Sequence, residues 1–128
     1  MPFAHVHLRS GRTAEQKKAV LDGLHAALVE AFRVPEADRN QLLHEYPPED
    51  CEARHGPEAV CVEISVFPGR SAEAKRLLYR ALVRNLEERA GIAKDRVLVV
   101  LHEPPLENWG IRGGQAATDV AIGFKLDV

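Results

Sequence analysis

Polar and hydrophobic residues alternate over two short stretches of the chain, the period-2 pattern typical of a strand with one covered face. The clearer stretch is at residues 60–66, and the same spacing recurs at residues 2–8. Each stretch precedes a segment whose hydrophobic residues return every three or four positions, which is the spacing of one helix face. Residues 41–45 and, more strongly, the apolar run at 97–101 then predict a strand after each helix.

Capping residues and breakers mark the ends of the two predicted helices. Thr13 with Gln16 three residues later resembles a capping box, and Ser71 can cap the second helix. Pro35 and Gly91 act as stop signals. The apolar stripes of the two helices are Val20, Leu24, Ala27, Leu28, Ala31 and Phe32, and Leu78, Ala81, Leu82 and Leu86.

An internal repeat relates the two halves of the chain. The heptapeptide at residues 11–17 recurs at 69–75, an offset of 58 residues, and the register persists well past the motif without a gap. So long a shared register indicates two homologous β-α-β units. We therefore predict one domain made of repeats at about residues 1–50 and 58–114, with a C-terminal tail at 115–128.

A strand, a helix and a strand with short connections imply a right-handed crossover and parallel pairing. The predicted fold class is therefore α/β (α+β), with two β-α-β units sharing a four-stranded sheet and both helices on one face. The alternation of Ile122, Phe124 and Leu126 predicts a short C-terminal strand. The other sheet face bears apolar side chains and needs a partner surface, so we expect a closed homo-oligomer.

Composition and charge narrow the range of partners. The chain has 128 residues and a net charge of -2, from 17 basic and 19 acidic side chains without a block of like charge. We therefore expect no nucleic-acid partner and no membrane association. The pair Cys51 and Cys61, with no signal-peptide pattern, indicates reduced thiols in a cytoplasmic protein. His5 and His7 share a strand face, but two ligands do not make a metal site and no metal is predicted.

Several features together resemble the tautomerase superfamily: the duplicated plan, Pro2 after the initiator, the Gly-Arg-Ser/Thr-x-Glu-x-Lys helix starts, and Asn-Trp-Gly-Ile-Arg-Gly-Gly at 108–114. The chain looks like a fused 4-oxalocrotonate tautomerase. Residues 32–39 and 43–45 make its first half most similar to malonate semialdehyde decarboxylase. The resemblance implies a homotrimer with an N-terminal proline in the active site, a small 2-keto, enol or haloacrylate carboxylate as substrate, and no metal or organic cofactor.

The resemblance makes Pro2 the predicted catalytic base. Once Met1 is removed, the amine of Pro2 is secondary and held in a ring. An α-amine already titrates at about pH 8. Apolar walls and a positive neighbour would lower this pKa further and leave a neutral amine for general base catalysis. A retained Met1 would block the amine and would favour a non-catalytic binding protein of the same fold.

Arg70 is the second predicted catalytic residue. It precedes the cap of the second helix, where its guanidinium could bind a carboxylate bidentately and polarise a neighbouring 2-keto oxygen. Its repeat partner Arg12 has the same local setting, but Val60 stands where the first half has Pro2. The pocket expected beside Arg12 therefore lacks a base, and we predict one competent site per chain.

The resemblance adds Asp38, which matches a functional aspartate of the decarboxylase, and Trp109, which matches an aromatic residue that shields tautomerase sites. A structural role stays open for each residue. Asp38 could be a loop aspartate paired with Arg39, and Trp109 could be a hydrophobic plug that holds the tail in place. The arginine that the decarboxylase carries just before the position of Arg70 is missing here, and Arg39, Arg54 or Arg112 could substitute for it.

We therefore predict a cofactor-independent tautomerase or isomerase that moves a proton between the keto and enol forms of a small 2-keto carboxylate. The predicted catalytic residues are Pro2, Arg70 and Asp38. The predicted substrate-binding residues are Arg70, Trp109, Arg112 and Arg39. Decarboxylation of a 3-oxo acid, or hydration or dehalogenation of a small unsaturated acid, is the alternative reaction at this site.

Overall fold

The elements of the chain follow the repeat. The computed structural model describes residues 2–54 and 56–128. The first unit consists of β1 (Phe3–Arg9), α1 (Ala14–Phe32) and β2 (Gln41–Tyr46). The second consists of β3 (Val60–Ser65), α2 (Ala72–Ala90) and β4 (Val97–His102).

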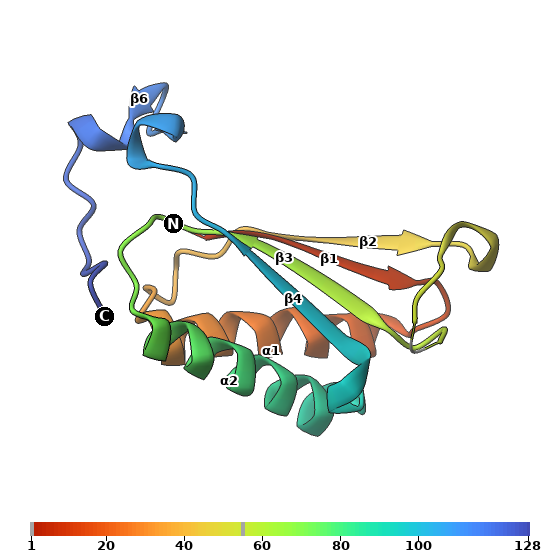
Figure 1. Cartoon of the computed structure of the whole chain (residues 1–128). Coiled ribbons are helices and arrows are strands. Elements are labelled where there is room, and N and C mark those ends of the chain that lie inside the picture. Colours follow the sequence, from red (N-terminus) through yellow and green to blue (C-terminus); the bar gives the residue numbers. More distant parts are fainter. Residues whose placement is uncertain (1, 55) are drawn as a thin grey trace.

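The four strands form one mixed sheet in the order β2-β1-β3-β4. The pairs β1–β2 and β3–β4 are parallel, and the central pair β1–β3 is antiparallel. Both helices lie side by side on one face of this sheet (Figure 1). The predicted duplicated fold is confirmed.

The core lies between the helices and the sheet, and the alternation of the strands creates it. Val6 of β1 and Ile64 of β3 are fully buried on the helix side, as are Leu24 and Leu82 of the helices. The helices approach each other closely at Gly23, where a Cβ atom would lie 3.3 Å from the Cβ of Asn85. The side-chain amide of Asn85 also donates to the carbonyl oxygen of Gly23, at 3.0 Å.

The helix starts agree with the capping signals. The backbone N–H of Gln16 donates to Thr13 Oγ1 at 3.1 Å, and the Gln16 side chain accepts from the Thr13 N–H at 2.9 Å. Ser71 Oγ accepts from the N–H of Ala74 at 3.1 Å. Helix α1 ends at Arg33, which adopts a left-handed conformation with φ of 55°, and α2 ends at Gly91 with φ of 69°.

The C-terminal region does contain strands, but not where the sequence placed them. Strands β5 (Gly110–Ile111) and β6 (Gln115–Ala116) form a short antiparallel hairpin that stands off the sheet (Figure 1). Residues 122–126 form no strand, so that placement is wrong. Their alternating apolar side chains instead pack on a small cluster around Phe67. The tail then returns to α2, where the N–H of Ser71 donates to the carbonyl oxygen of Val128 at 2.9 Å.

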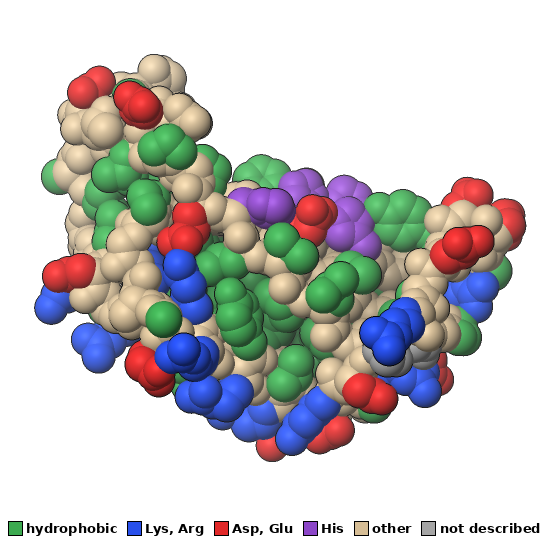
Figure 2. Space-filling model, viewed as in Figure 1, with side chains coloured by type: hydrophobic (Ala, Val, Ile, Leu, Met, Phe, Trp, Pro, Cys, Tyr) green, Lys and Arg blue, Asp and Glu red, His purple; other side chains and the backbone are tan. Residues whose placement is uncertain are grey.

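We call the sheet face without helices the open sheet face. Its side chains are Phe3, His5, His7, Leu42, His44, Tyr46, Cys61, Glu63, Ser65, Leu98, Val100 and His102. The expected apolar character holds for Phe3, Leu42, Leu98 and Val100, which are 40–59% exposed. Histidines occupy much of the rest of this face. They lie at the bottom of a hollow beside the hairpin (Figure 2). Among the described residues, neither helix is long and apolar enough to cross a membrane.

Candidate active site

Pro2 is buried at the start of β1 and lies beside the segment that precedes β2. The side-chain amide of Asn40 donates to the Pro2 carbonyl oxygen at 3.4 Å and to Asp38 Oδ1 at 3.3 Å. The Asn40 carbonyl oxygen accepts from the N–H of Ala4 at 3.0 Å. Asn40 therefore links the predicted base to the predicted catalytic aspartate. The removal of Met1 lies outside the described residues.

A small cavity of about 50 Å³ opens next to Asp38. The side chains that line it are Asp38, Phe67, Ile111, Arg112, Ile122 and Phe124. Four of these are apolar and come from the loop after β3, the hairpin and the tail. One acidic and one basic group thus line a small space whose other walls are apolar.

Arg70 lies close to Phe67 and Phe124, two of the residues that line this cavity. It is only 6% exposed, and its Nη1 donates to the carbonyl oxygen of Phe67 at 2.9 Å. Its guanidinium carbon lies 4.9 Å from the ring centre of Phe32 and 5.9 Å from that of Phe124. Burial lowers the pKa of Arg70, and the charge of Glu103 opposes that shift. An arginine stays protonated even so, which makes Arg70 a buried cation with a rigid setting.

The buried Arg70 retains hydrogen-bonding capacity. Among the described residues its Nε has no hydrogen-bond partner. An unpaired buried donor is costly, and a ligand oxygen would remove that cost. Arg70 is therefore a buried cation with one donor that no described group satisfies.

Trp109 does not line the cavity but contacts Phe67, which does. Its ring meets that of Phe67 edge-to-face, with centres 4.9 Å apart and planes at 76°. Its Nε1 donates to the carbonyl oxygen of Pro104 at 3.1 Å, which fixes the hairpin to the end of β4. The indole lines a separate hollow on the open sheet face, together with Phe3 and His5. Both roles expected for Trp109, a shield and a plug for the tail, fit this position.

The two other predicted binding arginines differ in position. Arg112 lines the small cavity and adopts a left-handed conformation with φ of 49°. Arg39 instead donates from Nη2 to Asp22 Oδ1 of α1 at 2.6 Å, and does not line the cavity. The structure therefore brings Asp38 and Arg112 together and leaves Arg39 on the helix side.

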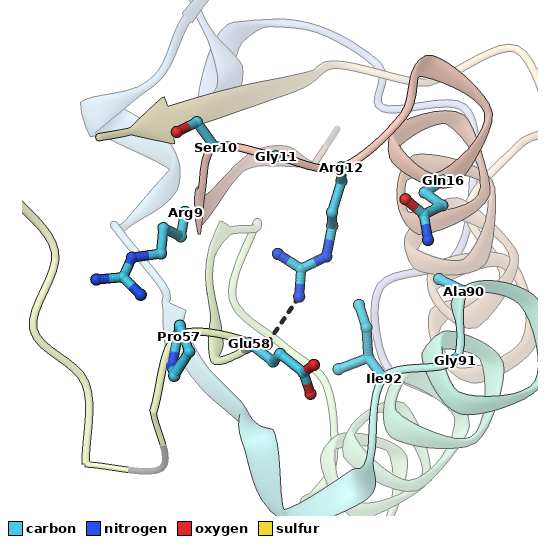
Figure 3. Close-up of a pocket in the computed structure, with 10 residues that line it drawn as sticks. All are labelled: Arg9, Ser10, Gly11, Arg12, Gln16, Pro57, Glu58, Ala90, Gly91 and Ile92. Carbon is cyan, nitrogen blue, oxygen red and sulfur yellow. Dashed lines mark hydrogen bonds between the residues drawn. The ribbon is translucent and has the colours of Figure 1, made fainter. Parts of the chain in front are cut away.

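Arg12 lies at a second and larger cavity of about 340 Å³, between the end of β1 and the end of α2. Figure 3 shows its guanidinium pointing into this space, where Nη2 donates to the carbonyl oxygen of Glu58 at 2.9 Å. Val60, the counterpart of Pro2, is fully buried inside β3 and carries no amine. The second cavity thus holds an arginine, but the second unit has no counterpart of the Pro2 amine.

Sequence reasoning missed the residues that complete the site. Asn40 and the apolar lining residues Phe67, Ile111, Ile122 and Phe124 were not predicted as site residues. The position of Phe67, three residues before Arg70, could have been a signal, but nothing local predicts that the tail returns to α2. Among the described residues, no group of three or more histidine, cysteine, aspartate or glutamate side chains could hold a metal ion.

Comparisons with known proteins show the family of the chain. Two family models, both described as tautomerase enzyme, match residues 2–52 and 38–112. The probable tautomerase YrdN of Bacillus subtilis is 34% identical over 122 residues, which cover 91% of this chain and 95% of that protein. The 2-hydroxymuconate tautomerase of Comamonas testosteroni is 44% identical over 50 residues, covering 39% of this chain and 79% of that enzyme.

Solved structures share the whole fold. Malonate semialdehyde decarboxylase superposes with a TM-score of 0.82 at 32% identity, covering 93% of this chain and 99% of that one. A wild-type fused 4-OT that forms a symmetric trimer superposes with a TM-score of 0.82 at 28% identity, covering 91% and 96%. The chain therefore belongs to the tautomerase superfamily, as a fused two-unit member, and is an enzyme.

Proposed function

We propose that this protein catalyses keto–enol tautomerisation of a small 2-keto carboxylate, with the amine of Pro2 as the base and acid. The observation that carries the proposal is the position of Pro2, buried at the start of β1 and joined through Asn40 to Asp38 at the apolar cavity. Burial of Pro2 would favour the neutral form of its amine, because a charged ammonium loses hydration when it is buried. Such an amine can accept a proton near neutral pH.

The proposed reaction moves one proton and changes no oxidation state. In the enol-to-keto direction the amine takes the proton of the 2-hydroxyl group, and the released electron pair forms the carbonyl π bond at C2. The C2–C3 π pair then takes a proton at C3 from the proline ammonium. Arg70 would bind the substrate carboxylate, because its buried guanidinium has a donor without a partner. Asp38 and Arg112 would orient the reacting end, and Phe67 and Trp109 would keep water away.

The proposal extends to assembly and setting. We infer that the chain forms a homotrimer, as its fused 4-OT relative does, and that each chain holds one competent site because Val60 replaces the second proline. Three further points also stay predictions. They are the division into units at about residues 1–50 and 58–114 with a tail at 115–128, the absence of a cofactor, and the cytoplasmic location.

The replacement Pro2→Ala tests the base. We expect it to lower the rate of phenylenolpyruvate ketonisation by about 10²–10⁴-fold, the range typical of general acid–base catalysis. Mass spectrometry of the intact chain establishes first that Met1 is absent. The matched control is Val60→Ala at the equivalent position of the second unit, which should retain most activity. Undiminished activity of Pro2→Ala would refute the role of Pro2.

Decarboxylation of a 3-oxo acid is the second candidate, favoured by 32% identity to malonate semialdehyde decarboxylase over nearly the full chain. In that reaction the bond between the carboxylate carbon and C2 breaks, CO2 leaves, and the electron pair forms an enolate. For this reaction the proline must begin as the ammonium, which donates a proton to C2 and regains one from water. A faster turnover of malonate semialdehyde than of phenylenolpyruvate would establish this reaction in place of tautomerisation.

A further inference from the structure

Four histidines of the open sheet face form a connected network with Tyr46 and Glu63. His5 Nδ1 and His44 Nε2 lie 2.7 Å apart, and their rings stack with centres 5.0 Å apart. A contact this short between two ring nitrogens holds one proton, with one nitrogen donating and the other accepting. If both nitrogens are protonated, two N–H groups face each other and the contact breaks.

The second part of the network centres on His7. Its Nε2 donates to Glu63 Oε2 at 2.8 Å, and its Nδ1 lies 2.6 Å from the Tyr46 hydroxyl oxygen. A neutral imidazole satisfies both contacts when the phenol donates to Nδ1. His102 Nε2 lies 3.6 Å from the other oxygen of Glu63. The hydrogen bond from His7 lowers the pKa of Glu63, burial opposes this shift, and the nearby His102 adds to it.

The network can compensate little positive charge. Among the described residues, Glu63 is the one carboxylate in direct contact with any of the four imidazoles, and it contacts two of them, His7 and His102. The rings of His7 and His44 are also stacked, with centres 4.9 Å apart. The other titratable or charged groups on or beside this face are Arg9, Tyr46, Asp50, Cys51, Glu52 and Cys61. Full protonation would therefore place several like charges against one another, and of the carboxylates on or beside this face only Glu63 contacts an imidazole directly.

This face has the shape and composition of a surface that another copy of the chain covers. Its hollow is bounded by the C-terminal hairpin, and its apolar side chains Leu98, Leu42, Val100 and Phe3 remain exposed in the single chain. Both helices lie on the opposite side, so among the described residues neither helix covers it (Figure 1). A relative of the same two-unit fold forms a symmetric trimer.

We propose that copies of this chain associate through the open sheet face and that the association requires most of its histidines to be neutral, so that mild acid dissociates the assembly. The inference rests on the proposed homotrimer but not on the proposed reaction. Covering the face removes water from the imidazoles, and a charged imidazole loses more on burial than a neutral one. Histidine is the side chain whose charge ordinarily changes between about pH 5 and 8. Protons taken up on dissociation therefore drive the assembly apart as the pH falls.

Sedimentation velocity of the full chain at pH 8.0 and 5.5 tests the proposal. We expect a trimer at pH 8.0, an apparent association constant at least about tenfold weaker at pH 5.5, and recovery of the trimer on return to pH 8.0. Circular dichroism should show a folded chain at both values. The double variant His5→Gln/His44→Gln removes the proton-sharing pair, so it should stay trimeric to a lower pH than the wild type.

A fixed charge gives an independent readout. His44→Lys should prevent assembly at pH 8.0, whereas the matched lysine substitution Ala93→Lys, in the exposed loop after α2, should leave it intact. A wild-type trimer that persists unchanged at pH 5.5, or a His44→Lys chain that still forms trimers, overturns the inference. A wild-type chain that is monomeric at pH 8.0 refutes the homotrimer itself. The ketonisation assay of the Pro2→Ala variant is separate and stands or falls alone.

Discussion

Arg70 and Arg12 occupy equivalent positions in the two repeats, yet their surroundings differ. The heptapeptides around them are nearly the same, so local sequence predicts one conformation for both. The C-terminal tail breaks this equivalence, because Phe124 packs near the guanidinium of Arg70 while Arg12 faces an open cavity. A buried cation with a free donor binds an anion more strongly than an exposed one, since less water competes for it.

The replacement Arg70→Ala should therefore lower kcat/KM by about 10–150-fold, equivalent to the 1.5–3 kcal/mol of a hydrogen bond to a charged group. The matched variant Arg12→Ala should change kcat/KM less than about twofold, since the second unit has no N-terminal proline amine to serve this cavity. Steady-state ketonisation kinetics measure both, and urea unfolding shows whether the variants remain folded. Equal losses in the two variants would contradict the assignment of a single competent site.

At the scale of elements, an ion pair fastens the segment that carries Asp38 and Asn40 to α1. Asp22 of this helix accepts from Lys18 at 2.7 Å and from Arg39 at 2.6 Å. The hydrogen bond from Lys18, followed by that from Arg39, lowers the pKa of Asp22. A carboxyl group whose pKa is lowered by folding stabilises the folded state above its unfolded pKa, and this contribution disappears as the pH falls through the folded pKa.

We expect Asp22→Asn to reduce the free energy of unfolding by about 0.5 kcal/mol at pH 7, a magnitude set by the partial exposure of the pair. The difference from the wild type should shrink below the ordinary aspartate pKa of about 3.9 and vanish at still lower pH. Urea unfolding between pH 7 and 3 measures it. The exposed Asp119→Asn serves as the control, and a pH-independent difference would exclude the ion pair as the cause.

The helices and strands that could be predicted from the sequence are those whose residues show a local periodicity. The alternation around Val62 and the caps Thr13 and Ser71 determine strands and helices without reference to distant residues. The tail was placed wrongly because alternating apolar side chains also occur where an irregular segment packs one side on a cluster, as Phe124 does. The histidine network escaped prediction for a related reason. His5 and His44 meet only through the register between β1 and β2, which no local pattern encodes.

For the whole molecule, the candidate site depends on segments from the beginning, middle and end of the chain. Pro2 lies at the start, Phe67 and Arg70 follow β3, and the tail brings Phe124 over them. The tail is held by the hydrogen bond from Ser71 to Val128 and by contact of Leu126 with Gly69, whose φ of 127° suits glycine. The repeat thus specifies the sheet and the helices. The tail has no counterpart in the first unit, and it adds apolar side chains to the cavity at Asp38 but not to the cavity at Arg12.

The replacement Phe124→Ala tests this view. Loss of the ring should admit water to the cavity and to Arg70, because Phe124 lines the one and lies near the other. We expect kcat/KM to fall about tenfold, the scale of a missing apolar contact in a substrate pocket, with the trimer unchanged. The neighbouring exposed residue provides the control, since Lys125→Ala should leave the kinetics as they are. Undiminished kcat/KM in Phe124→Ala would mean that the tail stabilises the fold without closing the site.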